Sequence, residues 1–292
     1  MPLQSNRIYS LIVGDVNGAE GWEITDLHIT FDISKMSDNK EKNNSATIEI
    51  YNLSREKQKL LQKNYIGAVL SVGWRDEGLK RLFAGQVTEA STRKSGADVI
   101  TILQIGVNYT ELNHQTLSKL VPEGRTYEDV ITEIAKELGT SRNVITGVNC
   151  KNLVIDGYPL SGTPRQMLDE VCRANEMEWS VDDKVLYVRD STESHTTDIN
   201  SVVVIGQDSG LIERPYVTTG EVNRSVRDKK KRKKGLQFRC LINPELVAGS
   251  LIKLEYEELT GYYRIDSMRI KGGWRDSDWY MDIKLTEKIG SV

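Results

Sequence analysis

Histidine is the side chain that most often does acid–base or metal chemistry near neutral pH, and this sequence has three. His28, His114 and His195 lie far apart, without the spacing of a metal-binding helix and without a neighbouring nucleophile elbow. The sequence contains no Gly-rich phosphate loop ending in Lys-Ser or Lys-Thr, and no strand-to-helix G-x-G-x-x-G. It therefore favours neither a histidine-dependent hydrolase nor a nucleotide-dependent enzyme.

The cysteines give no sign of a disulfide framework or a zinc site. Cys150, Cys172 and Cys240 are widely separated and show no paired spacing. We expect them to be small buried hydrophobic side chains. The residues predict no metal and no cofactor.

Acidic residues are plentiful, so a pair of catalytic carboxylates stays open on sequence alone. Asp182 and Asp183 are one example of such a pair. Adjacent Asp residues between two strand-like segments are also good turn formers, and we expect a turn here. A carboxylate enzyme is the alternative.

One run of six cations stands out in a sequence that is otherwise acidic. Removing the run from the formal net charge of −3 leaves −9. A mobile, solvated loop extended by its own repulsion is the favoured interpretation, and a phosphate-binding patch is the alternative. No aromatic residue is interleaved with the run, so stacking on bases has no support. The run consists of Lys229, Lys230, Lys231, Arg232, Lys233 and Lys234.

The composition bounds the overall class of protein. The length of 292 residues predicts two or three domains, and 38% hydrophobic with 28% charged residues is an ordinary balance for a globular protein. The apolar stretch at residues 8–14 is cut by Asp15 and is too short for a signal peptide or a membrane-spanning helix. We expect no membrane insertion and a chain that stays in the cytoplasm where it is made.

Period-two patterns dominate residues 24–107 and predict strands. Ala46, Ile48 and Ile50 alternate with polar residues, as a half-buried antiparallel strand requires. Ser54 is placed to cap a short helix over residues 55–63. Further strands are predicted over residues 69–74, 82–91 and 99–107.

The middle of the chain changes to a helical period. Thr126 with Asp129 begins one predicted helix, which Gly139 ends. A second helix is predicted from Thr163-Pro164-Arg165-Gln166, a capping box with proline at the first helical position. Its predicted apolar face is Met167, Leu168, Val171, Cys172 and Ala174. Residues 179–188 then predict a hairpin that turns at Asp182 and Asp183.

The last third of the chain repeats the pattern of the first third. Residues 48–50 lead through Asn52 to residues 67–74, as residues 238–240 lead through Asn243 to residues 249–256. Residues 83–87 and 100–105 are then matched by residues 262–265 and 279–285. We therefore predict an internal duplication of a β-domain on either side of the helical middle.

In their order and spacing, these segments resemble the hub proteins of phage baseplates and related prophage tails. Residues 31–107 resemble the first barrel of that family, residues 162–181 its helix-then-hairpin element, and residues 210–279 its second barrel. The resemblance implies a mainly β fold with an α+β middle domain. Two related tail-tube-like antiparallel β-barrels would be joined by a helix-containing domain. The expected domains are 1–107, a first tube-like barrel; 108–200, the α+β middle; and 201–292, a second barrel.

The resemblance also implies a function, which we expect to be structural and not enzymatic. The resemblance implies a homotrimer in which the two barrels of each subunit together form a pseudo-six-fold ring. The ring would join the hexameric tail tube to a trimeric central spike or fibre in the virion tail baseplate. The tape-measure protein and other baseplate proteins are the further expected partners, and DNA would pass through the lumen without specific binding.

Two other functions stay open beside the structural hub. One is a tail-associated peptidoglycan-degrading enzyme using carboxylates, and the other is a nucleic-acid-binding module using the basic run. Larger hubs continue into a lysozyme-like domain, whereas this sequence stops shortly after the second barrel. We therefore expect any cell-wall digestion to belong to another polypeptide.

Overall fold

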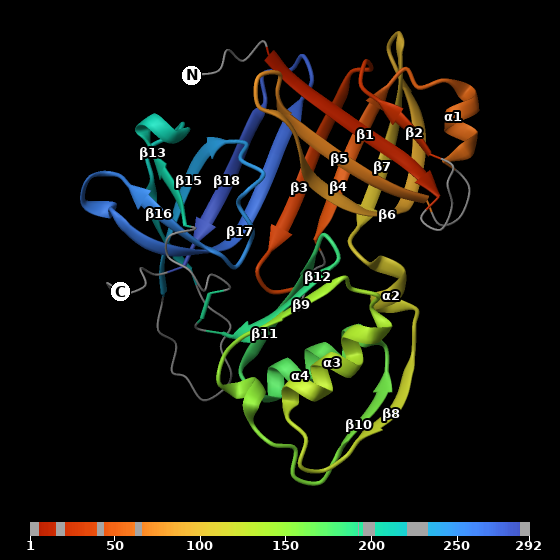
Figure 1. Cartoon of the computed structure of the whole chain (residues 1–292). Helices are drawn as coiled ribbons and strands as arrows, with labels where there is room; N and C mark the ends of the chain where they lie inside the picture. Colours follow the sequence, from red (N-terminus) through yellow and green to blue (C-terminus); the bar gives the residue numbers. More distant parts are fainter. Residues whose placement is uncertain are drawn as a thin grey trace.

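The computed structural model describes residues 6–15, 21–39, 44–61, 66–191, 193–194, 202–220 and 233–286. Strands from both ends of the chain form a β-rich part, and the middle of the chain forms a smaller helix-containing part below it in Figure 1. The predicted class, mainly β with an α+β middle, is confirmed.

The first third of the chain is built from strands with one buried face. In β3 and β4 every second residue is buried, and the predicted inward residues Ala46, Ile48 and Ile50 are all buried. The Ser54 hydroxyl accepts a hydrogen bond from the Lys57 N–H and caps α1, which ends earlier than predicted. The elements are β1 (Arg7–Asp15), β2 (Gly21–Ile24), β3 (Ile29–Met36), β4 (Ser45–Tyr51), α1 (Arg55–Leu60), β5 (Ile66–Trp74), β6 (Gly78–Ser95) and β7 (Asp98–Gly106).

The middle of the chain contains the two predicted helices. Both begin with a complete capping box, at Thr126 and at Thr163, and Gly139 follows the first helix with φ +59°. Ala174 was predicted on the buried face of the second helix but is exposed, because it is the last helical residue. The elements are α2 (Tyr109–Asn113), β8 (Leu117–Val121), α3 (Tyr127–Glu137), β9 (Arg142–Ile145), the 3₁₀ turn Asn149–Lys151, β10 (Tyr158–Gly162), α4 (Pro164–Ala174), β11 (Met177–Asp182) and β12 (Val185–Asp190). The exact domain boundaries stay predictions.

The last third returns to strands. Its core alternates in the same way, with Ile252 and Leu254 of β16 and Ile283 of β18 fully buried. The elements are β13 (Val203–Gly206), the 3₁₀ turn Gln207–Ser209, β14 (Tyr216–Gly220), β15 (Lys233–Leu241), β16 (Leu251–Glu255), the 3₁₀ turn Glu257–Leu259, β17 (Gly261–Gly273) and β18 (Trp279–Leu285).

Two series of strands share one pairing order, which confirms the internal duplication at the level of topology. In the N-terminal series, β3 pairs with β4, β4 with β7, β7 with β6 and β6 with β5. In the C-terminal series, β14, β15, β18, β17 and β16 pair in the same order. All these pairs are antiparallel. Ile48 lies opposite Leu103 as Phe238 lies opposite Ile283.

The two series also share an irregularity. The register of β6 against β7 shifts after Val87, and the register of β17 against β18 shifts after Ile265. A bulge is a specific feature of a strand and not a defect, so a register shift at the same place in both series supports the duplication. The outermost strands differ, because β1 is antiparallel to β5 whereas β13 is parallel to β16.

The two series form one continuous sheet through the pairing of β3 with β17. The order is β14-β15-β18-β17-β3-β4-β7-β6-β5-β1-β2, and β16, which carries β13, also pairs with β17. Among the described strands, hydrogen bonding does not close either series into the expected barrel. The observed arrangement is an open sheet whose two halves are related.

Candidate assembly surfaces

The contact between β3 and β17, which we call the β3–β17 joint, holds the two series together. Residues 30–36 pair with residues 267–273. Across it, Arg269 donates from Nε and Nη2 to the two Asp32 carboxylate oxygens, at 2.9 and 2.6 Å. Lys271 Nζ lies 3.7 Å from the same carboxylate. The hydrogen bond from Arg269 lowers the pKa of Asp32 and raises that of Arg269.

Close packing reinforces the β3–β17 joint. A Cβ atom on Gly272 would lie 2.3 Å from Cζ of Phe31, so only glycine leaves room for that ring. Phe31 meets Trp279 edge-on at 5.8 Å between ring centroids, and Trp279 meets Trp74 at 6.0 Å. The joint is therefore a packed interface as well as a row of hydrogen bonds.

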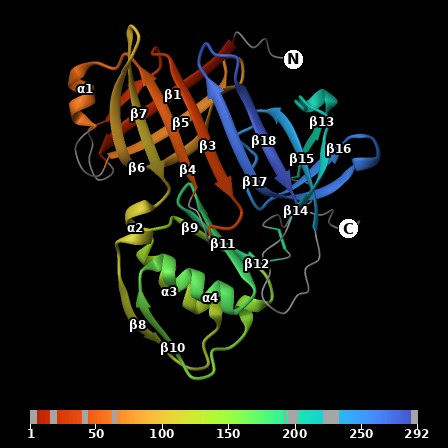
Figure 2. The ribbon, with the colours of Figure 1, turned by 180° about the vertical axis from the view of Figure 1, so that it is seen from behind.

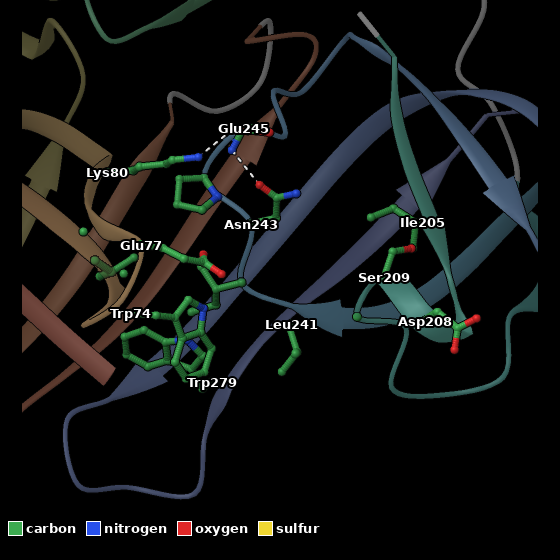
Figure 3. A pocket seen from close by; sticks show the side chains of 16 residues that line it. Trp74, Glu77, Lys80, Ile205, Asp208, Ser209, Leu241, Asn243, Glu245 and Trp279 are labelled. Carbon is green, nitrogen blue, oxygen red and sulfur yellow. Dashed lines mark hydrogen bonds and ion pairs between the residues drawn. The ribbon is translucent and has the colours of Figure 1, made fainter. Parts of the chain in front are cut away.

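A cavity of about 420 Å³ lies between the two series, and Trp74 and Trp279 are among the residues that line it (Figure 3). The turn between β5 and β6 supplies Glu77, the start of β6 supplies Lys80, and the segment after β15 supplies Asn243 and Glu245. Lys80 Nζ lies 2.6 Å from Glu245 Oε1, and Asn243 Oδ1 accepts from the Glu245 N–H. The ion pair is exposed, so it bridges the series at the surface and offers no buried acid or base.

A buried ion cluster attaches the middle of the chain to the sheet. Glu178 and Arg189 face each other on β11 and β12, 2.7 Å apart, and Arg264 of β17 lies 3.5 Å from Glu178. Arg189, fully buried, also donates to the Ser37 carbonyl at 3.0 Å. Burial raises the pKa of Glu178 despite the two arginines, and lowers the pKa of Arg189 to about 10.

Sequence reasoning missed this cluster. Glu178 and Arg189 flank the predicted hairpin over residues 179–188, and the turn predicted at Asp182 and Asp183 does not place them opposite each other as the observed pairing does. Charged residues at such positions are easily taken for solvated ones. Only the fold shows that the end of β3 and the strand β17 cover them.

The two aspartates considered as a catalytic pair have structural roles. Asp182 is the last residue of β11 and not a turn residue, and its Oδ2 lies 2.8 Å from Lys35 Nζ in a largely buried ion pair. Asp183 is in the turn with Lys184, both at positive φ, and its Oδ1 lies 2.6 Å from Arg81 Nη1. The predicted turn is therefore displaced by one residue, to Asp183 and Lys184.

The histidines and cysteines are not gathered into a site. His28 contacts the Trp274 carbonyl and packs against the Tyr51 ring at a tilted angle, and His195 lies outside the described residues. The three cysteines are buried, as expected, and burial raises the pKa of Cys240 to about 12. In the described part of the chain, no group of three His, Cys, Asp or Glu residues is arranged to hold a metal ion.

The comparisons with known proteins identify the family. Residues 15–284, most of the chain, match the family model described as Baseplate hub gp41. The chain belongs to this family. Among curated proteins, none matches the sequence.

Solved structures share the fold of this hub chain. A tail protein from Neisseria meningitidis MC58 has a TM-score of 0.64 and 13% identity, over 96% of each chain. The 43 kDa tail protein of prophage MuSo2 from Shewanella oneidensis has a TM-score of 0.61 and 9% identity, over 95% of the hub chain and 98% of that chain. A Francisella PdpA–VgrG complex has a TM-score of 0.64 and 7% identity, over 98% of the hub chain and 59% of that chain.

The basic run of the hub chain lies largely outside the described residues. Lys229, Lys230, Lys231 and Arg232 are not described, so the mobile loop stays a prediction for them. The backbone of Lys233 and Lys234 begins β15 and pairs with β14, so the predicted loop does not extend over these two residues. Of the helices in the described residues, none is long and apolar enough to cross a membrane.

Proposed function

We propose that this chain is the structural hub of a phage or phage-like tail baseplate, acting as a homotrimer that forms a pseudo-six-fold ring. The observation that carries the proposal is the duplicated pairing order, with the same register shift in β6 and in β17. A chain that contains the same sheet element twice presents two similar units to its surroundings. Three copies of the chain would therefore present six similar units.

Six similar units arranged with true three-fold symmetry would adapt one symmetry to another. One side of the ring would meet a hexameric tail tube, and the other a trimeric spike or fibre. The Francisella PdpA–VgrG complex has a similar fold within an assembly of different proteins, which supports a role in assembly for this chain. The tape-measure protein and other baseplate proteins are further proposed partners.

We propose no catalytic role for the chain. The carboxylates considered for one, Asp182 and Asp183, are each paired with a cation from the sheet. A zymogram with the purified protein tests the absence of activity, and cleared peptidoglycan would contradict it.

Without its basic run the chain is acidic, and like charge disfavours adhesion of DNA phosphates to a lumen that DNA must traverse.

Electron microscopy of the purified assembly tests the ring. End-on class averages should show three-fold symmetry with six similar densities around a central channel. Averages with a two-fold axis, or with six identical densities and no three-fold distinction between them, would contradict the proposal.

A further inference from the structure

Two strand edges of the sheet have no partner among the described residues. Strand β14 lies at one end of the sheet order and pairs only with β15. Strand β6 pairs with β5 through residues 78–86, so residues 87–95 pair only with β7. These edges lie on opposite sides of the β-rich part (Figure 2).

The internal duplication shows what such edges contact. In the C-terminal series, the second half of β17 pairs with β18 on one side and with β3 on the other. Its counterpart in the N-terminal series is the second half of β6, and the counterpart of β3 is β14. The β3–β17 joint is thus an observed contact between two strands whose counterparts in the other series are β14 and β6.

We propose that β14 of one copy pairs antiparallel with residues 87–95 of β6 in a second copy of this chain. The inference rests on the proposed ring and names the contact that builds it. Within one chain the two edges are separated by six strands of the same sheet. A contact between unlike surfaces of successive copies is heterologous, and such contacts close into a ring when the rotation between copies allows it.

The β3–β17 joint also gives the register on the β6 side. Ala90 lies opposite Leu103 as Met268 lies opposite Ile283, so Thr92 corresponds to Ile270 and Arg93 to Lys271.

On the β14 side, Val217 lies opposite Leu236 as Ile33 lies opposite Ala46, so Val217 corresponds to Ile33. Its neighbours Tyr216 and Thr218 then correspond to Asp32 and Ser34.

In the β3–β17 joint, Ile270 faces Ile33 and Lys271 faces Asp32. Transferred to two copies, Thr92 faces Val217 and Arg93 faces Tyr216.

The difference in burial between β3 and its counterpart β14 supports this register. Ile33 is 0% exposed in the joint, whereas its counterpart Val217 is 54% exposed and Tyr216 is 51% exposed. An exposed apolar edge strand is a template for pairing with another chain, and native proteins usually cover or blunt such an edge. A second copy covers both side chains.

The chemistry of the contact differs from that of the joint in one respect. The joint is held by the ion pair of Arg269 with Asp32, and Tyr216 replaces the aspartate at the corresponding position of β14. Arg93 then meets an aromatic ring, and guanidinium groups stack on such rings. Arg239 already lies 3.9 Å from the ring centroid of Tyr280 in the neighbouring strand pair.

Disulfide cross-linking tests the register directly. A chain carrying Thr92→Cys and Val217→Cys should form covalent dimers and trimers on a non-reducing gel, because facing residues bring their Cβ atoms within disulfide reach. The matched control carries Ser91→Cys and Val217→Cys. Its first cysteine points to the opposite face of β6, so it should cross-link several-fold less.

The mass of each reduced variant in solution separates the two proposals. If the variants are trimers but the chain with Thr92→Cys and Val217→Cys cross-links no better than the control, this edge contact is overturned and the proposed ring is not. Monomers, both alone and when mixed with the tail tube protein, would overturn both. As a second variant, Val217→Lys should leave the melting temperature unchanged and lower the trimer fraction at least tenfold, and an unchanged trimer fraction would overturn the contact.

Discussion

The amino group of Lys35 on β3 lies 2.8 Å from the carboxylate of Asp182 on β11, and both side chains are nearly buried. This ion pair joins the sheet to the helix-containing part. Beside it, Asn44 Nδ2 donates to the Val181 carbonyl at 2.8 Å, and the Asn39 N–H donates to the Trp179 carbonyl at 2.8 Å. Polar contacts therefore fix the orientation of the middle of the chain, because each is satisfied in only one arrangement.

Removing one member of this buried pair should be costly. Asp182→Asn leaves the Lys35 charge buried without its counter-ion, and we expect the free energy of unfolding to fall by about 3–5 kcal/mol. Urea denaturation followed by tryptophan fluorescence measures the change. The matched control is Asp183→Asn, whose pair with Arg81 is exposed and should contribute about 0–1 kcal/mol. Equal losses in the two variants would show that burial does not decide the effect.

The β3–β17 joint should respond to acid through Asp32. Hydrogen bonding to Arg269 lowers the pKa of Asp32 in the folded chain, so its stabilisation is fully present above the unfolded pKa and is lost as the pH falls through the folded pKa. At pH 7, Asp32→Asn should lower the free energy of unfolding by about 0.2–1 kcal/mol, since the pair is partly exposed. The difference from the wild type should disappear in acid, and a difference that grows in acid would contradict this account. Arg269→Gln should reproduce the same pH dependence.

Gly272 should tolerate no side chain. A methyl group there would enter the Phe31 ring, and we expect Gly272→Ala to lower the free energy of unfolding by about 1–3 kcal/mol through overpacking. Gly21→Ala is the control, since the nearest atom to its added Cβ is 3.4 Å away. That variant should stay within about 0.5 kcal/mol of the wild type. Thermal unfolding measures both, and a neutral Gly272→Ala would mean that the ring can move aside.

The capping box of α4 should contribute measurably to stability. The Thr163 hydroxyl accepts from the Gln166 N–H, and Gln166 Oε1 accepts from the Thr163 N–H at 3.0 Å. Thr163→Ala should cost about 0.5–2 kcal/mol in chemical denaturation, whereas Thr163→Ser keeps the acceptor and should lose much less. Equal effects of the two substitutions would place the role of Thr163 in packing of its methyl group.

Replacing the six cations of the basic run by Ser should leave the trimer intact. The proposed contact between copies uses Thr92, Arg93, Tyr216 and Val217, and none of them belongs to the run. Gel filtration of the variant should give the mass of the wild type. Loss of the ring would assign the run to the interface. Retention on DNA that weakens steeply across a salt series in the wild type, and is absent from the variant, would assign it to phosphate binding.

Local signals in the sequence predicted the elements that depend on local physics. The capping box at Thr163 and the alternation at Ala46, Ile48 and Ile50 require only neighbouring residues, and both are confirmed. The internal duplication was also visible, because buried positions recur in the same order in both series.

Features that depend on contacts distant in sequence were beyond a single sequence. Lys35 and Asp182 are 147 residues apart, so no local rule pairs them. The β3–β17 joint, which makes one sheet out of two expected barrels, joins residues more than 200 positions apart.

The mass of the purified protein in solution, measured by light scattering coupled to gel filtration with and without the tail tube protein, shows whether three copies of the chain associate. We expect a particle that contains three chains of 33.0 kDa each, either as a free trimer or in complex with the tail tube protein. A chain that stays monomeric in both conditions, or that forms a closed dimer, would contradict the proposal that three duplicated chains make one ring.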